Sequence, residues 1–409
     1  MDDLVNLNPA IEVALLGAAL ALLPAAWVLW RGRRLGLQGW PQWQRVLTVA
    51  TLFLTLDLVV FGAFTRLTDS GLGCPDWPGC YGELSPWQAH ADIGAAQAAV
   101  PGGPVTHGKA WIEMVHRYLA TGVGALITGL MVLAWRMRKA GGLSPWWATA
   151  TFVWVCAQGA FGALTVTLKL QPIVVTGHLL GAMLGVAMLT AQVRALSSQP
   201  HVHNPAHAAL NDVWRDAPLR GAGLALLILL VLQIASGAWV STNYAVLACS
   251  EFPKCQGQWW PEADFHAAFR FMRPLGGDAE GGYLTLAGLT AIHLTHRCLA
   301  IVVAFAVLLY AWRLHRWQAA GLQPWRHEAR VLVGLLLWQV ASGLSNVVLG
   351  WPLVAALAHT LGAALLVAWL TRLWVLPRGE ALARSARDGA PGHQGHQGHH
   401  PGVMRPSES

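Results

Sequence analysis

The sequence predicts an all-α integral membrane protein: two pseudo-symmetric four-helix bundles with eight core spans, plus an extra N-terminal span. Hydrophobic residues make up 55% of its 409 residues and charged residues only 11%, whereas a soluble domain carries about 25% charged residues. Apolar runs of about 20 residues recur, each long enough to cross ~30 Å of hydrocarbon as a helix. A long outer loop followed by a short one occurs twice, which indicates an internal duplication.

The first apolar run extends from about residue 10 to residue 30, and Arg31, Arg33 and Arg34 follow it. A signal peptide carries its basic residues before the apolar run, but this chain begins Met-Asp-Asp. We therefore interpret residues 1–40 as an extra span, with its N-terminus outside, and a basic inner loop. An interfacial helix is the alternative.

Eight further apolar runs supply the core spans. They lie near 46–64, 111–135, 146–168, 173–194, 221–243, 288–312, 328–349 and 353–376. The loops on one side are rich in arginine, which makes that side cytoplasmic by the positive-inside rule. The loops on the other side are mainly acidic, and two of them are long, at about 65–110 and 244–287. The net charge of +7 thus reflects orientation, and we expect no nucleic-acid partner.

Residue matches support the duplication. The motif Glu113-x-x-His116-Arg117 aligns with His293-x-x-His296-Arg297, and the segment from His178 aligns with that from His359. A Gln-x-Ala-Ser-Gly pattern occurs at 233–237 and 339–343, with a looser version at 158–162. Small residues at such spacing allow helices to approach closely in lipid. The predicted halves are residues 41–200 and 201–377.

Residues 378–409 form a tail rich in Gly, Pro, Ser and His. Such a composition cannot bury a core, so we expect disorder. Its histidines could bind a metal, as could His201, His203 and His207 in the central inner loop. The alternative is that these flexible His-rich segments have no specific metal role.

Four histidines lie inside spans at matched depths. His116 and His178 belong to the first half, and His296 and His359 to the second. Each lies one or two turns inside the outer end of its span, so each half offers a facing pair. A buried imidazole in lipid needs a partner or a ligand. A hydrogen-bonded interior histidine is the simpler interpretation of any one of them alone.

A facing histidine pair suits a porphyrin iron, which takes axial ligands from opposite sides. Zinc would require three or four ligands at one depth, and only the first half offers a further one, Glu113. We therefore predict one haem site in each half. Arg117 and Arg297 at the span mouths could pair with haem propionates. The alternative is that these two arginines extend to the lipid headgroups.

The two halves differ at one position. Glu113 precedes His116 by three residues, so both side chains share a helix face. The second half has His293 there. A carboxylate beside an iron site can accept a proton, although Glu113 could instead pair with Arg117 or Lys109. The difference indicates chemistry in the first half and a permanent cofactor in the second. His293 could assist the haem site or lie solvated at the interface.

Cysteines occur in both long loops with the same spacing. Cys74 and Cys80 lie in the first loop, and Cys249 and Cys255 in the second. The predicted outer compartment is oxidising, so we expect two disulfides. Loops this short gain little chain-entropy stabilisation, which leaves a redox role open beside a purely structural one. The other cysteines, Cys156 and Cys298, fall within spans and are expected to be packing residues.

Three motifs together resemble the haem A synthases. The first is the stretch from Gly62 to Cys80, Gly-Ala-Phe-Thr-Arg-Leu-Thr-Asp-Ser-Gly-Leu-Gly-Cys-Pro-Asp-Trp-Pro-Gly-Cys. The second is Glu113-x-x-His116-Arg117, and the third runs from Cys249 through Phe252-Pro253 to Trp259. The resemblance covers about residues 45–376. The extra N-terminal segment and the His-rich tail lie outside it.

The resemblance implies an enzyme that oxidises the methyl group of haem O to the formyl group of haem A by successive hydroxylations, for terminal oxidase biogenesis. By resemblance, His116 and His178 would hold the substrate haem beside an essential Glu113, and His296 and His359 would ligate a permanent haem B. It also implies that the Cys74 and Cys80 pair is functionally important.

The resemblance further implies a setting in the bacterial cytoplasmic (inner) membrane. The long Cys-containing loops would lie outside and the C-terminus in the cytoplasm. The expected partners are membrane lipid, haem O synthase and oxidase assembly factors, and a homo-oligomer is a further expectation. Two rival functions are a dihaem b-type electron-transfer subunit, in which Glu113 is incidental, and a haem transporter or chaperone that releases its haem unchanged.

Overall fold

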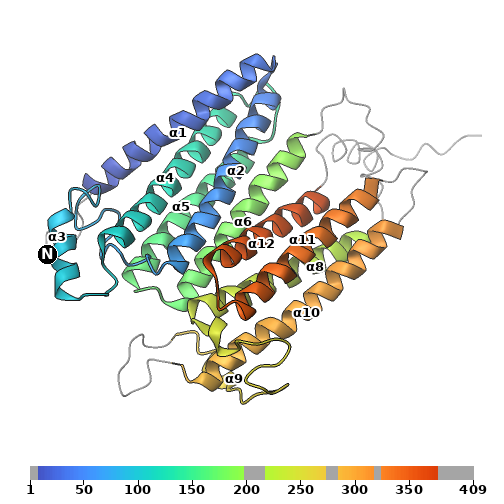
Figure 1. Ribbon diagram of the computed structural model, residues 1–409. Coiled ribbons are helices and arrows are strands. Elements are labelled where there is room, and N and C mark those ends of the chain that lie inside the picture. The colour runs from blue at the N-terminus through green and yellow to red at the C-terminus, as the bar shows by residue number, and fades with distance from the viewer. Residues whose placement is uncertain (1–7, 198–216, 273–283, 317–323, 376–409) are drawn as a thin grey trace, which may run out of the picture.

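The computed structural model describes residues 8–197, 217–272, 284–316 and 324–375, and within these it is helical without β-strands. Nine of the described helices are long and apolar enough to cross a membrane. The predicted all-α membrane fold is therefore confirmed, and the chain is a multi-pass membrane protein. The nine helices are α1 (Asn8–Arg34), α2 (Trp40–Leu67), α4 (His107–Arg136), α5 (Pro145–Thr167), α6 (Pro172–Leu196), α8 (Ala217–Thr242), α10 (Leu286–Arg316), α11 (Pro324–Val348) and α12 (Leu353–Trp374) (Figure 1).

The helices extend a few residues beyond most of the predicted apolar runs, and local signals set several of their first turns. Helix α4 begins after Thr106, whose side chain accepts a hydrogen bond of 3.2 Å from the Lys109 amide. Helices α5 and α6 begin with Pro145 and Pro172. Proline suits a first helical position, because the amide missing there has no intrahelical partner in any case.

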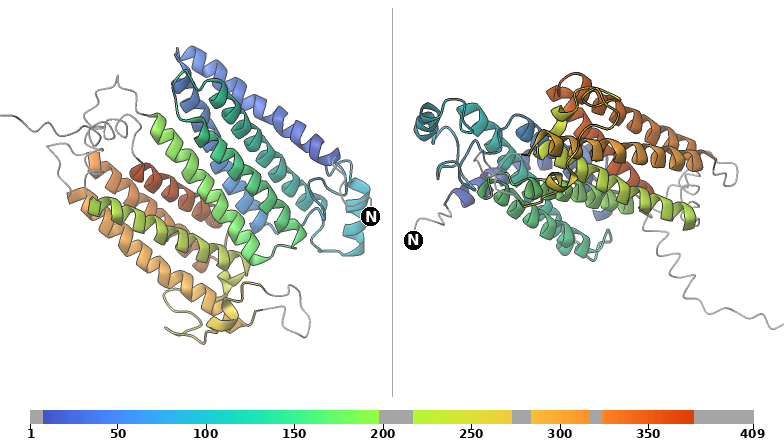
Figure 2. Two further views of the ribbon diagram at one scale, coloured as in Figure 1. Left: turned by 180° about the vertical axis from the view of Figure 1, so that it is seen from behind. Right: turned by 90° about the horizontal axis from the view of Figure 1, so that it is seen from below.

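Helices α2, α4, α5 and α6 form one closed ring in which each packs against the next, and α8, α10, α11 and α12 form a second ring in the same order. Figures 1 and 2 show the two groups side by side. Helix α12 contacts α2 and α6, and α6 contacts α8, so these contacts join the rings. A cluster of buried apolar side chains fills the second ring and this junction, including Val186, Val307, Leu314, Leu332 and Ala364.

Helix α1 lies outside the first ring, packed along α4 and more lightly against α2 (Figure 1). Gly17 of α1 makes this close approach possible, because a Cβ there would overlap Thr121 of α4. The extra N-terminal segment is thus a helix long and apolar enough to span a membrane, as its prediction as an extra span requires.

The long outer loops contain short elements. They are α3 (His90–Ala99), η2 (Ala245–Ala248) and α9 (Phe265–Ala268). The sequence analysis did not anticipate α3, although its Ala-rich segment favours a helix. The predicted boundary at residue 200, the inner-loop histidines and the tail from residue 378 lie outside the described residues.

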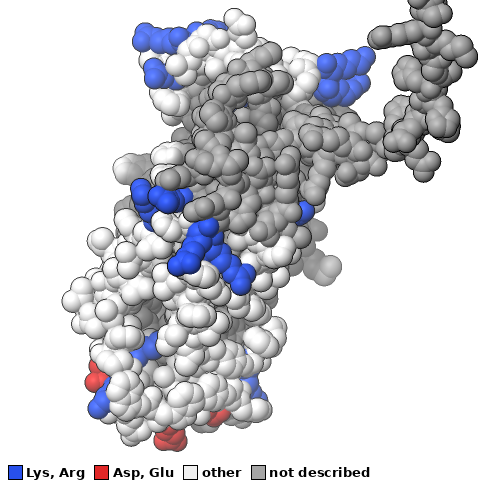
Figure 3. All heavy atoms as spheres, turned by 90° about the vertical axis from the view of Figure 1, so that its right-hand side faces the viewer, with Lys and Arg blue, Asp and Glu red and all other residues white. Residues whose placement is uncertain are grey.

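Figure 3 shows where charges lie on one face of the molecule. The acidic side chains in view lie at its lower end, whereas lysines and arginines lie at the upper end, in the middle and also at the lower end. In Figure 1, the same lower end carries α9 and the second long loop.

The two rings also meet through polar contacts at the outer end. The Arg66 guanidinium donates to the backbone oxygen of Ser241 at 2.5 Å and lies 4.2 Å from the centre of the Tyr244 ring. The Tyr244 hydroxyl donates to Asp69 at 2.6 Å. Burial raises the pKa of the Tyr244 phenol above its ordinary value, and the bond to Asp69 adds to this while Arg66 opposes it. This junction connects the first long loop to the end of α8.

One expectation about packing is wrong. Cys156 in α5 and Cys298 in α10 are free thiols, and both are exposed rather than packed between helices. The reason is that their helix faces look outward from the rings, where a thiol is apolar enough to face lipid.

Candidate functional site

The structure places the four histidines in two opposed pairs. His116 on α4 and His178 on α6 stand on opposite helices of the first ring, within electrostatic range of each other. His296 on α10 and His359 on α12 stand in the same relation in the second ring. All four side chains are only partly buried. Each ring of helices thus brings together the two histidines predicted to pair.

Each histidine lies against a glycine of a neighbouring helix. A Cβ added at Gly62 of α2 would lie 3.0 Å from His116, and one at Gly162 of α5 would lie 3.7 Å from His178. The equivalent positions in the second half are Gly237 of α8, 2.9 Å from His296, and Gly343 of α11, 3.0 Å from His359. The glycines therefore leave the space that the imidazoles occupy, in the same arrangement in both halves.

The second pair is held by polar side chains. Ser236 and Ser342 place their hydroxyl oxygens 2.9 and 3.0 Å from Nδ1 of His296 and His359, respectively. The Gln339 amide donates to the backbone oxygen of His359 at 2.9 Å. These residues belong to the repeated Gln-x-Ala-Ser-Gly pattern, which the sequence analysis interpreted only as a helix-packing signal. The repetition next to a histidine-bearing span was the signal for a site.

The donor set of each ring fits a haem. Two neutral imidazoles on opposite helices can bind one iron from its two sides. The first ring also contains a buried polar atom that requires a partner, since Nδ1 of His178 has none among the described residues. No three His, Cys, Asp or Glu side chains gather into a metal-ion site in the part of the chain that is described, so a tetrahedral zinc site has no ligand set there.

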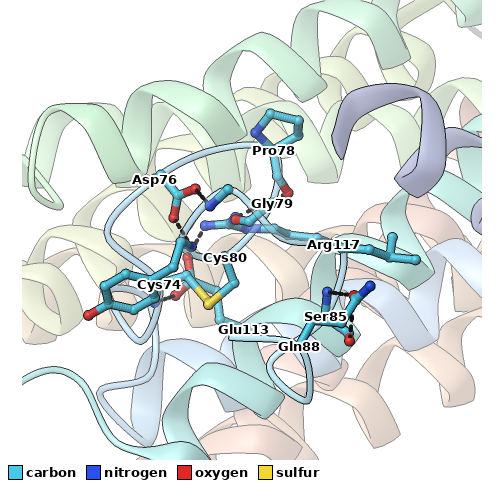
Figure 4. Close-up of a disulfide and its surroundings, with 12 residues drawn as sticks. Cys74, Asp76, Pro78, Gly79, Cys80, Ser85, Gln88, Glu113 and Arg117 are labelled. Atoms are coloured by element: carbon cyan, nitrogen blue, oxygen red, sulfur yellow. Dashed lines mark hydrogen bonds and ion pairs between the residues drawn. A yellow bond between two sulfur atoms is a disulfide. The ribbon is translucent and has the colours of Figure 1, made fainter. Parts of the chain in front are cut away.

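Glu113 lies buried between α4 and the first long loop. One carboxylate oxygen pairs with Arg117 at 2.5 Å, and the other accepts the Cys74 amide at 2.8 Å. Figure 4 shows the carboxylate beside the disulfide. The side chain is only 4% exposed, so it is held by these partners rather than by solvent. Of the alternatives from the sequence, the structure shows pairing with Arg117 and no ion pair to Lys109.

The two arginines anchor the loops. Arg117 donates to the backbone oxygens of Pro78 and Gly79, at 3.2 and 2.5 Å (Figure 4). Arg297 donates to the backbone oxygens of Cys249, Glu251 and Lys254, at 2.8 to 3.1 Å. Both arginines contact the backbone of their own loops, because each loop folds back over its helix. Pairing with propionates stays a prediction.

His293, at the position equivalent to Glu113, is 3% exposed and its Nδ1 lies 3.1 Å from the backbone oxygen of Ala245. The alternative of a solvated His293 is therefore wrong. The η2 segment covers it, and no pattern in the sequence predicted that contact.

Both cysteine pairs form disulfides, Cys74–Cys80 and Cys249–Cys255. The two loops repeat each other in detail. In each, an isolated β-bridge begins at the second cysteine, pairing Cys80 with Glu83 and Cys255 with Gln258. A carboxylate closes each turn: Asp76 accepts the amides of Tyr81 and Gly82, and Glu251 accepts that of Gly257. Each half thus consists of four helices and one disulfide-closed cap.

Burial, together with the nearby carboxylates of Asp76 and Asp92, raises the pKa of the Tyr81 phenol in the first cap. Tyr81 has a positive φ of 53°, and Gln256 has the same φ at the equivalent turn position. Non-glycine residues seldom adopt this conformation. Its recurrence supports a common origin of the two caps.

Comparison with known proteins identifies relatives over most of the chain. The COX15-CtaA family model, described as cytochrome oxidase assembly protein, matches residues 45–371. A protein of Shewanella oneidensis named Heme A synthase is 38% identical over 333 residues, which cover 79% of this chain and 93% of that protein. Proteins of the same name from Rhizorhabdus wittichii and Halalkalibacterium halodurans are 28% and 25% identical, over 78% of this chain and 89% and 93% of theirs. The family match spans all four histidines and both caps.

Proposed function

The chain belongs to the COX15-CtaA family, the family of the haem A synthases, and from this premise we propose which haem each of its two halves binds. It is an enzyme that oxidises haem O to haem A. The proposal assigns the substrate to the first half and a resident haem B to the second. The observation that carries this division is the buried Glu113, which sits three residues from His116 and has a histidine as its counterpart in the second half.

In the first half, His116 and His178 would hold the substrate haem from opposite helices. A haem iron supplies the oxidising chemistry that an inert methyl group needs and that acid–base side chains alone cannot supply. Glu113 would accept or release protons at this site. Its carboxylate is buried and already paired with Arg117, so a proton moved there is coupled to the position of the first cap through the Cys74 amide.

In the second half, His296 and His359 would ligate haem B. Support comes from the serine and glutamine contacts that hold the imidazoles of these two histidines in place. Arg297 could still reach a propionate, because its buried Nε has no partner among the described residues. Arg117 would face the substrate haem in the same way, although its described contacts already use both terminal nitrogens.

We also propose the setting of this reaction. The protein would lie in the bacterial inner membrane with both disulfide caps outside and the C-terminus in the cytoplasm, and the position of the acidic side chains at one end of the face in Figure 3 supports this orientation. Haem O synthase and oxidase assembly factors are the proposed partners, and a homo-oligomer is compatible with this arrangement. Residues 41–200 and 201–377 would form the two halves.

The experiment that tests the function is expression in a host that makes haem O but not haem A, followed by purification of the protein and extraction of its haems. We expect haem A or a hydroxylated intermediate, identified by mass. A dihaem electron-transfer subunit would yield only haem B, and a haem transporter would yield unchanged haem O. Either of these results would contradict the proposal.

A further inference from the structure

The histidines of the second half are hydrogen-bonded at Nδ1, and the proton count at the serines decides in which direction. Ser236 donates to the backbone oxygen of Gln233 at 2.8 Å, and Ser342 donates to that of Trp338 at 2.7 Å. A hydroxyl has a single proton. Once that proton is used on the backbone, each serine can only accept from the imidazole. Nδ1 must therefore carry the ring proton, and Nε2 keeps its lone pair for a metal.

The Gln233 amide is compatible with this tautomer. Its Nε2 lies 3.1 Å from Nδ1 of His296, and its Oε1 has no partner among the described residues. Turning the amide by half a rotation places Oε1 toward the ring. Oε1 then accepts the same Nδ1 proton, in exchange for the 3.4 Å contact of Nε2 with the backbone oxygen of His296.

The first half lacks these serines. Each serine directly precedes the glycine that faces a histidine, and in the first half Phe61 and Phe161 occupy those places. The Phe61 ring stacks against His116, with centroids 6.3 Å apart and planes at 9°. Nδ1 of His178 is buried without a partner among the described residues. No described side chain fixes the tautomer in this half.

The imidazole of His116 also differs from those of His296 and His359 in the atom that it turns toward the neighbouring glycine. The His116 atom nearest to a Cβ at Gly62 would be Nε2, at 3.0 Å. At Gly237 and Gly343 the nearest atom would be Cε1, with Nε2 farthest of the three at 3.7 and 3.9 Å. For His116 alone Nε2 therefore faces its glycine, since the nearest atom of His178 to a Cβ at Gly162 is Cε1, as in the second half.

We infer that Ser236 and Ser342 are positioning residues that make the second half a retaining haem site, and that Phe61 and Phe161 keep the first half exchangeable. The inference rests on the proposed function, which requires one haem to stay and another to leave as product. The serines fix the orientation and tautomer of each imidazole before the haem binds. Binding of the retained haem therefore costs less conformational freedom of the two histidines. Phe61 packs on the His116 ring without a hydrogen bond that would fix either property, and the Phe161 side chain has no hydrogen-bonding group to offer His178.

The test uses full-length protein in a His116→Ala/His178→Ala background, so that all bound haem belongs to the second half. Haem B release into excess apomyoglobin is followed for this protein and for its Ser236→Ala/Ser342→Ala derivative. We expect release to become roughly 10- to 100-fold faster in the derivative, the usual range for loss of a histidine's outer hydrogen bond. The low-spin ferric EPR signal should also shift, which a purely structural loss would not produce.

Two controls make the result specific. Ser345→Ala removes a half-buried serine of the helix of Ser342 whose hydroxyl donates to the backbone oxygen of Ala341 and contacts neither histidine, and it should leave release unchanged. Threonine at 236 and 342 keeps the hydroxyl and should restore slow release. Equal release rates and EPR signals in the serine and alanine forms would overturn the inference. A background protein without any haem would instead contradict the proposed function.

The reverse exchange tests the inference without weakening a site. In a His296→Ala/His359→Ala background, Phe61→Ser/Phe161→Ser should slow the release of haem from the first half by at least several-fold. Unchanged or faster release would count against the assignment of the phenylalanines.

Discussion

At the scale of single residues, the two halves differ most at the position three residues before the first histidine. Glu113 joins the helix of His116 to the first cap through Arg117 and the Cys74 amide, whereas His293 bonds only to a backbone oxygen. A carboxylate can exchange a proton and keep its position, because its two oxygens bond independently. This difference gives a chemical role to one half alone.

Glu113→Gln should reduce the conversion of haem O by roughly 100- to 10,000-fold, the range for loss of a general acid or base, while the haem B content stays at the wild-type level. The glutamine keeps the shape of the side chain but cannot exchange the proton. Haem extraction and mass analysis measure both quantities.

Glu328→Gln is the matched control, since Glu328 is a similarly buried carboxylate that pairs with Arg372, far from the cap of the second half. It should lower thermal stability without blocking conversion. Full activity in Glu113→Gln would show that the Glu113 carboxylate takes no part in the reaction.

At the scale of elements, the sequence predicted the spans closely because the apolar runs must match the hydrocarbon thickness. Predicted run 146–168 became Pro145–Thr167, for example. Helix α3 was missed because it lies in a loop, where membrane hydropathy gives no signal. The serine contacts could not be predicted either, because a hydrogen bond between helices depends on their rotation, and the sequence pattern is equally consistent with simple packing.

Gly343→Ala should displace His359 and reduce haem B content at least ten-fold, because the added methyl would lie 3.0 Å from the ring. Overpacking of this kind costs about 1–3 kcal/mol, and the displaced ring loses its alignment. Pyridine haemochrome spectra of the purified protein give the haem content.

Gly334→Ala, on the same helix, meets nothing within 4 Å and should leave haem content unchanged while slightly favouring the helix. Normal haem content in Gly343→Ala would show that the close contact between Gly343 and His359 does not position the histidine.

At the scale of the whole molecule, two rings with one cap each are joined at the helix interface and at the Arg66–Tyr244 junction. The two long loops share a β-bridge that begins at the second cysteine. They also share a carboxylate that accepts a backbone amide of the turn. The sequence predicted this duplication from matched motifs. It could not predict that each arginine would bind its own cap, because the caps fold back over the helices only in three dimensions.

Tyr244→Phe should lower stability by about 1 kcal/mol through loss of the bond to Asp69. Because the folded-state pKa of Tyr244 is raised, its contribution is complete below about pH 10, the ordinary tyrosine pKa, and is lost as the pH rises through the folded value. The difference in Tm between wild type and Tyr244→Phe should therefore shrink at alkaline pH. A constant difference up to pH 11 would contradict this assignment.

The central claim is that the first histidine pair holds the substrate and the second holds the resident haem. The most direct test is to extract the haems of two variants purified from a host that makes haem O and to identify them by mass. The variants are His116→Ala/His178→Ala and His296→Ala/His359→Ala. We expect the first variant to retain haem B and lack haem O, haem A and hydroxylated intermediates, and the second to lack haem B. The same mixture of haems in both variants would contradict the division of labour between the halves.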